Sequence, residues 1–417
     1  MYAISLAAFV LPYFIATPLI TYYYDAKGLR KYPNFTFFSV LRIGPNALSI
    51  SDLRDIKDIY GHGTTCIKDR FYSETAGTHA HLADVVDKSD HARKRKVLSS
   101  AYALKNLEEW EFKVADVTGK LIKAFDPRCT GSLSPGTIPE TKDLTVDYRN
   151  WTVLFAATAI ANIGLSEDLG LLDEGSDQDC HVATARVSYQ LVWVYDRFKT
   201  LKRVSQLISP NYQRMWKLDG DWGGIVYNRA TTRLKRYMAG EELDDFFTAM
   251  MEDKNGAPQN LEWGEIVAEI NIMMNAGHDT TAISLRNNLT KSLNEDEVVA
   301  SYGKIKHLPY LRACIDESLR MLPPVIFGLP RRTPLEGALI LDDFIAGDIS
   351  VSMSATGARD CIGRSISYLE QTVLIASLVH HYEFALPSAD WDPAVRETTN
   401  LSWSDATEDM EKDDRMR

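Results

Sequence analysis

The segment that decides the fold is S-A-T-G-A-R-D-C-I-G-R (Ser354 to Arg364). Its Cys361 stands directly before a predicted helix, where the helix dipole and free backbone N–H groups favour a thiolate. Gly357 and Gly363 flank the cysteine and let the backbone lie flat against a wide group, and Arg359 offers a bidentate donor for a carboxylate. Taken alone, the segment fits two interpretations equally well: a thiolate ligand for a haem iron, or a buried cysteine in a glycine-rich turn.

The longest predicted helix, from about Leu261 into the Leu290s, carries A-G-H-D-T-T (Ala276 to Thr281) in its middle. Glycine costs about 1 kcal/mol inside a helix relative to alanine, and an acid followed by two threonines competes with the helical hydrogen bonds. We expect a local interruption that opens a groove, in which Asp279 and Thr280 relay protons from solvent to a buried site. The alternative is a simple kink or helix end at Gly277.

Two weaker motifs each contain a pair of residues whose spacing places them on the same face of a helix. Glu317 and Arg320, in E-S-L-R, are three residues apart and can pair. The proline-rich stretch and P-R-R-T (Pro330 to Thr333) that follow predict a buried clamp, although such a pair is often solvated. His91 and Arg95, in H-A-R-K-R-K, are four apart and could together hold carboxylates, or could belong to an ordinary solvated basic face.

The remaining pattern predicts a mainly α fold with a small β-rich part. A strand pair with a turn is expected over Val40 to Ser51, and further strands over Leu339 to Ser352. Further helices are expected over about Asp90 to Phe125 with a break near Leu104, Val146 to Leu165, Val187 to Ser209, Arg229 to Met251, His307 to Leu322 and Ile362 to His380.

The composition excludes several classes of protein. The 417 residues include 46 Lys and Arg against 57 Asp and Glu, a net charge of −11, which disfavours nucleic-acid binding. The five cysteines form no C-x-x-C pair, so we expect neither a zinc ribbon nor a disulfide scaffold, and mostly reduced thiols.

The amino-terminal segment predicts a membrane anchor. Met1 to Tyr24 contains no charged side chain and is long enough to span a bilayer core. Lys27, Arg30 and Lys31 follow it, which places the remaining chain in the cytosol. A cleaved signal peptide would instead have basic residues before the apolar run and a small-x-small site after it. We therefore divide the chain into an anchor, residues 1–24, and one domain, residues 25–417.

Taken together, and in their order along the chain, the four motifs resemble those of the cytochrome P450 family, the haem-thiolate monooxygenases. H-L-P-Y-L-R-A-C-I-D-E-S-L-R-M-L-P-P (His307 to Pro324) and G-L-P-R-R-T-P (Gly328 to Pro334) are similar to filamentous-fungal microsomal members of the benzoate 4-monooxygenase and pisatin demethylase type. The resemblance implies the cytochrome P450 fold with several internal gaps, and a role for each motif.

The resemblance implies that Cys361 is the axial thiolate of heme b and that Asp279 and Thr280 deliver protons to dioxygen. Glu317 and Arg320 would support the core near the haem. The haem propionates would be held by His91, Arg95, Arg359 and either Arg331 or Arg332. Positions that face substrate are expected within Phe71 to Val85, Met273 to Gly277 and Val325 to Leu329.

No nucleotide-binding G-x-G-x-x-G fingerprint is visible, so electrons must come from a partner. The resemblance implies NADPH–cytochrome P450 reductase at the endoplasmic reticulum membrane, with Lys94 or Arg364 among the residues that meet it. The implied reaction inserts one oxygen atom from O2 into a small apolar or aromatic molecule, in fungal secondary metabolite biosynthesis.

The chain also departs from the family pattern. Ser354 stands where a phenylalanine is usual, and only 44 positions separate Glu317 from Cys361, several dozen fewer than in other members. Two alternatives therefore remain open. One is a non-catalytic, truncated or mis-spliced remnant unable to hold haem; the other is a haem-thiolate isomerase or dehydratase that needs no reductase.

Overall fold

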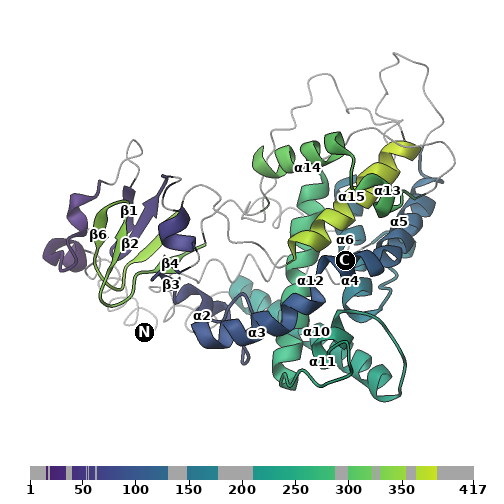
Figure 1. The fold of residues 1–417 in the computed structure, drawn as a ribbon, viewed down its shortest axis with the longest axis horizontal. Helices are drawn as coiled ribbons and strands as arrows, with labels where there is room; N and C mark the ends of the chain where they lie inside the picture. Colours follow the sequence, from purple (N-terminus) through teal and green to yellow (C-terminus); the bar gives the residue numbers. More distant parts are fainter. Residues whose placement is uncertain are drawn as a thin grey trace, which may run out of the picture.

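The computed structural model describes residues 16, 19–33, 40–52, 54, 56–61, 63–129, 148–176, 210–286, 299–321, 324, 329–353 and 363–382. These residues form two lobes, with the strands gathered at one end of the longest axis and most of the helices at the other (Figure 1). Helices α2 and α3 lie between them.

The described helices include those expected from the sequence and several short ones that were not expected. They are η1 (Leu29–Lys31), η2 (Ile56–Tyr60), α2 (Phe71–Thr75), α3 (Lys88–Ala101), α4 (Leu104–Glu109), α5 (Glu111–Phe125), α6 (Tyr148–Leu165), α7 (Leu171–Glu174), α10 (Pro210–Met238), α11 (Phe246–Met251), α12 (Trp263–Arg286), α13 (Tyr302–Ile305), α14 (Pro309–Met321) and α15 (Arg364–His381).

The strands form one five-stranded and one two-stranded sheet. The larger sheet has the order β1 (Val40–Gly44), β2 (Ala47–Ile50), β7 (Ser350–Met353), β4 (Arg331–Arg332), β3 (Ile67–Lys68), and β2 runs parallel to β7 while the other neighbours are antiparallel. The smaller sheet is the hairpin β5 (Ala338–Ile340) and β6 (Asp343–Ile345). Segments from both ends of the chain thus share one small core, which includes Leu48, Ile59 and Val351.

The helical lobe is built on the close approach of α12 to α6. A side chain at Gly277 of α12 would place its Cβ 2.5 Å from Cγ1 of Ile160, and one at Gly164 of α6 would meet Met273. Each helix thus has a glycine facing a bulky side chain of the other, so the two backbones approach closely. Helix α15 packs against both α12 and α5, which closes the larger core.

Most of the main elements predicted from the sequence are confirmed where the structure describes them. The strand pair over Val40 to Ser51 is present as β1 and β2, and the break near Leu104 lies two residues earlier, at Tyr102 and Ala103. The predicted helix over Arg229 to Met251 is wrong as a single element, because α10 ends at Met238 and α11 begins after Asp245, which caps it. The predicted helix over Val187 to Ser209 lies outside the described residues.

The predicted anchor, residues 1–24, falls mostly outside the described residues. Among the helices that the structure describes, none is both long and apolar enough to cross a membrane. The described cysteines Cys66, Cys129 and Cys314 are free, as expected.

Candidate functional site

Asp279 and Thr280 lie in the second half of α12, where both side chains are half-buried. The Thr280 hydroxyl donates to the carbonyl oxygen of Ala276, one turn earlier, at 2.6 Å. The predicted interruption is absent, because α12 is α-helical throughout this motif. Gly277 does not open a groove; its missing side chain instead lets α12 pack closely against Ile160. The Thr280 hydroxyl is hydrogen-bonded to the backbone of its own helix.

The structure distinguishes Arg331 from Arg332, which the sequence could not. Arg332 forms ion pairs with Asp69 at 3.0 Å and with Asp348 at 2.8 Å, so its charge is already neutralised. Arg331 is 4% exposed, and its guanidinium donates to the Tyr72 hydroxyl at 3.0 Å and to a backbone carbonyl. Among the described residues, Arg331 has no carboxylate partner.

A buried guanidinium without a counter-ion is costly unless a ligand supplies one. The Arg331 guanidinium lies between the rings of Tyr60 and Tyr72, at 5.1 and 5.7 Å from their centroids. Strand pairing on both sides, to β3 and to β7, fixes its backbone. These contacts hold the side chain in place for a carboxylate, and Arg331 is therefore the better of the two candidates for a propionate.

His91 and Arg95 lie one turn apart on α3, and both are half-buried. Arg95 makes no ion pair with any residue that the structure describes, so it also remains able to bind a carboxylate. Lys94, between them, was expected to meet an electron-transfer partner, and this is wrong. The Lys94 side chain is 2% exposed, and its ammonium donates to the carbonyl of Ala80 and lies 3.1 Å from Glu265.

Glu317 and Arg320 pair as predicted, at 2.7 Å. The expectation of a buried clamp is wrong, since the two side chains are 54% and 69% exposed. They lie on the outer face of α14, away from its buried residues Leu311 and Ile315. Cys361 and Arg359 lie outside the described residues, and so do positions 325–328 of the expected substrate-facing segment.

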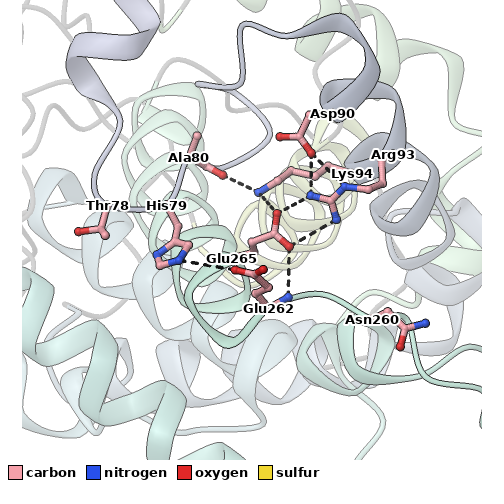
Figure 2. Close-up of a pocket in the computed structure, with 9 residues that line it drawn as sticks. All are labelled: Thr78, His79, Ala80, Asp90, Arg93, Lys94, Asn260, Glu262 and Glu265. Carbon is pink, nitrogen blue, oxygen red and sulfur yellow. Dashed lines mark hydrogen bonds and ion pairs between the residues drawn. The ribbon is translucent and has the colours of Figure 1, made fainter.

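The other expected substrate-facing segments have mixed outcomes. Met273 and Met274 are buried in the helical core beside α6. Thr78, His79 and Ala80 instead line a polar cavity of about 330 Å³ at the start of α12 (Figure 2).

The walls of this cavity carry an ion-pair network between α3 and α12. In Figure 2, Arg93 and Lys94 point toward Glu265 from α3, and Arg93 also reaches Asp90. Burial raises the pKa of Glu265, but hydrogen bonds from Arg93, from the backbone and from Lys94 outweigh it and bring the pKa to about 2. Arg93 and Lys94 are therefore already paired with Glu265, and these ion pairs hold α3 against α12.

Sequence reasoning missed one buried acid. Glu370 of α15 is completely buried, and neither of its oxygens accepts a hydrogen bond of normal geometry from a described residue. Burial raises its pKa to about 8, an effect that the Thr281 hydroxyl opposes. The available signal was a single acidic residue in the largely apolar stretch Tyr368 to Leu378. Periodicity alone does not show whether that residue is buried or faces solvent.

Comparison with known proteins decides the family. The family model "Cytochrome P450" matches residues 29–356, more than three quarters of the chain. The chain belongs to the cytochrome P450 family. The match includes α3, α12 and α14, and it ends five residues before Cys361.

Similar curated proteins are fungal enzymes of this family. Cytochrome P450 monooxygenase efuB of Hormonema carpetanum is 25% identical, over 84% of this chain and 80% of the relative. Benzoate 4-monooxygenase bphA of Aspergillus niger is 24% identical, over 83% and 80%. Tryprostatin B 6-hydroxylase of Aspergillus fumigatus is 25% identical, over 78% and 59%.

The alignment with efuB also bears on the internal gaps. It extends over 420 positions but uses 84% of this chain, about 350 residues, so about 70 positions of the relative have no counterpart here. This agrees with the short spacing between Glu317 and Cys361 seen in the sequence.

Two of the predicted site residues that the structure describes would suit the propionates of a haem. Arg331 is a buried cation with no carboxylate partner among the described residues, and Arg95 is a second cation without an ion pair to any of them. Two carboxylates are what a haem carries at its edge, and guanidinium groups bind carboxylates through paired N–H donors. The guanidinium groups of Arg331 and Arg95 are therefore chemically suited to bind the two haem carboxylates.

Proposed function

We propose that this chain is a haem-thiolate monooxygenase that inserts one oxygen atom from O2 into a small apolar or aromatic molecule in fungal secondary metabolism. The observation that carries the proposal is the P450 family match, together with a buried Arg331 that has no carboxylate partner in the described part of the chain. Relatives named for acting on benzoate and on tryprostatin B support an organic small-molecule substrate.

In this proposal Cys361 would bind the iron of heme b through its thiolate, and Arg331, Arg95, His91 and Arg359 would hold the haem propionates. When bound, haem supplies the redox chemistry, and a thiolate ligand favours cleavage of the O–O bond. The protein supplies orientation and protons. Asp279 accepts a proton from solvent, and Thr280 presents its hydroxyl from the adjacent position of α12.

We further propose that the electrons come from NADPH–cytochrome P450 reductase and that Met1 to Tyr24 anchors the chain in the endoplasmic reticulum membrane. The uncharged stretch and the basic residues that follow it support the anchor and its orientation. Reductase-dependent, NADPH-driven oxygen uptake with substrate separates this reaction from a haem-thiolate isomerisation or dehydration, which consumes no oxygen.

The test is a reduced carbon monoxide difference spectrum of the full chain expressed with haem supply. The proposal predicts the band of a thiolate-ligated haem, and predicts that Cys361→Ala abolishes it. Cys314→Ala is the matched control, because Cys314 is a free, half-buried cysteine on α14. A chain without bound haem refutes the proposal and supports a non-catalytic remnant. The same band in Cys361→Ala and in Cys314→Ala refutes the assignment of Cys361 as the iron ligand.

A further inference from the structure

A narrow crevice lies between α6, α10 and α12, on the side of α12 that faces away from Thr280. Successive residues of an α-helix are about 100° apart, so His278, which lines the crevice, points in nearly the opposite direction to Thr280. The lining is apolar except for His278 and Arg229, and it includes Ile160 of α6, Trp222 and Ile225 of α10 and Met274 of α12.

His278 contributes a buried hydrogen-bond acceptor to this crevice. Its side chain is 3% exposed, and its Nδ1 lies 3.1 Å from the carbonyl oxygen of Met274. A carbonyl oxygen can only accept, so Nδ1 carries the proton and Nε2 is the acceptor. Nε2 is buried and has no hydrogen-bond partner in the described part of the chain. Because a buried acceptor without a donor is costly, a molecule that brings an O–H or N–H group into the crevice would be favoured.

Helix α10 is locally weak at the place where it covers the crevice. Gly220, Gly223 and Gly224 lie on either side of Trp222, and no described atom is within 4 Å of a Cβ added at any of the three. Close packing therefore does not require glycine there, although glycine is the least favourable residue inside a helix after proline. Trp222 is 3% exposed and is held to α12 by the hydrogen bond from its Nε1 to Asn271, at 2.8 Å.

The crevice has an enclosed volume of about 10 Å³, which holds little more than one water molecule. A larger ligand enters only if one wall moves, and the glycine-containing turn of α10 is the wall that opens at the lowest cost. A charged ligand is not matched, because the crevice has no carboxylate among its described lining residues and Arg229 already pairs with Glu167.

We propose that this crevice is a second binding site, for a small, neutral, largely apolar molecule with one O–H or N–H group. The ligand donates that hydrogen to Nε2 of His278 and packs its apolar part against Trp222. The site is separate from the side of α12 that carries Thr280, and the inference does not depend on haem.

Phenol and toluene test the proposal, because they have nearly the same shape and only phenol can donate a hydrogen bond. The full chain is labelled with 5-fluorotryptophan and titrated with each compound in ¹⁹F NMR, and the Trp222→Phe variant identifies the resonance of Trp222. We expect phenol to shift this resonance at a concentration about tenfold lower than toluene, which is the discrimination expected of one buried hydrogen bond.

Two variants assign the discrimination to the proposed contacts. His278→Leu should remove it, so that toluene binds at least as well as phenol, whereas His307→Leu, at an exposed histidine before α14, is the matched control and should preserve it. Gly223→Ala/Gly224→Ala adds methyl groups where the described atoms leave open space, and should weaken phenol binding several-fold by stiffening α10.

The other outcomes overturn separate parts of the proposal. A Trp222 resonance that does not move at phenol concentrations that leave the chain folded overturns the binding site. Equal potency of phenol and toluene in the parent chain, or an unchanged preference in His278→Leu, overturns the role of His278 as the acceptor. Unchanged phenol affinity in the glycine double variant overturns the opening of α10.

Discussion

Replacement of Glu370 by Gln should stabilise the chain, and the gain should grow with pH. The Glu370 carboxyl is completely buried without a hydrogen-bond donor of normal geometry among the described residues, and burial raises its pKa from 4.5 to about 8. Below pH 4.5 the carboxyl is protonated in both states and imposes no penalty. Between pH 4.5 and 8 the unfolded chain releases the proton while the folded chain retains it, so stability falls as pH rises.

The size of this effect follows from the two pKa values. Each pH unit corresponds to about 1.4 kcal/mol, so the penalty is roughly 2 kcal/mol at pH 6 and on the order of 5 kcal/mol above pH 8. Glutamine keeps the shape but does not ionise, and any cost of burying its amide is the same at every pH. The informative quantity is therefore the change in the Glu370→Gln effect between pH 6 and 8.5, about 2.5 kcal/mol.

Urea unfolding of the two proteins at both pH values measures this difference. Glu317→Gln is the control, because Glu317 is exposed and its pKa is lowered by the Arg320 hydrogen bond, so it is ionised throughout this range. A Glu370→Gln effect that is the same at pH 6 and 8.5 would show that the carboxyl is solvated or paired, and would refute the reasoning.

Three further substitutions test the packing and the propionate assignment. Lys94→Met should destabilise the chain by about 3 to 5 kcal/mol in urea unfolding, because it removes the ion-pair partner of the buried Glu269. Arg320→Ala should leave the unfolding midpoint almost unchanged, because its pair with Glu317 is exposed; equal effects of the two substitutions would contradict this. Gly277→Val should cost about 1 to 3 kcal/mol through overlap with α6, while Gly220→Ala in α10, where no atom lies within 4 Å of the added Cβ, should gain up to about 1 kcal/mol. If Gly277→Val unfolds at the same urea concentration as the parent, the close helix approach is not required. Arg331→Met should lower the haem content per chain without lowering the unfolding midpoint of the haem-free protein, and unchanged haem content would remove Arg331 from the propionate site.

The sequence predicted the elements well where a local signal exists. The strand pair around the G-P turn and the long helix from Trp263 follow from composition and periodicity, and both are present. The five-stranded sheet was not predictable in this way, because β7 inserts between β2 and β4 from a segment about 300 residues away. Pairing over that distance depends on tertiary packing, which no local pattern contains.

The candidate site, like the fold, could be predicted from the sequence only in part. The sequence proposed that Arg331 or Arg332 binds a carboxylate, but only the positions of Asp69 and Asp348 show which cation is already neutralised. Gly277 was interpreted as a helix defect because a glycine inside a helix is costly, yet its reason is the side chain of Ile160 on another helix. Lys94 was interpreted as a surface charge because neighbouring basic residues usually are, whereas Glu265 and Glu269 bury it.

X-ray absorption at the iron edge of the haem-loaded full chain tests the central claim most directly. We expect one sulfur among the atoms that coordinate the iron, present in the parent and in Cys314→Ala and lost in Cys361→Ala. An iron surrounded only by nitrogen and oxygen ligands in the parent chain would contradict the account.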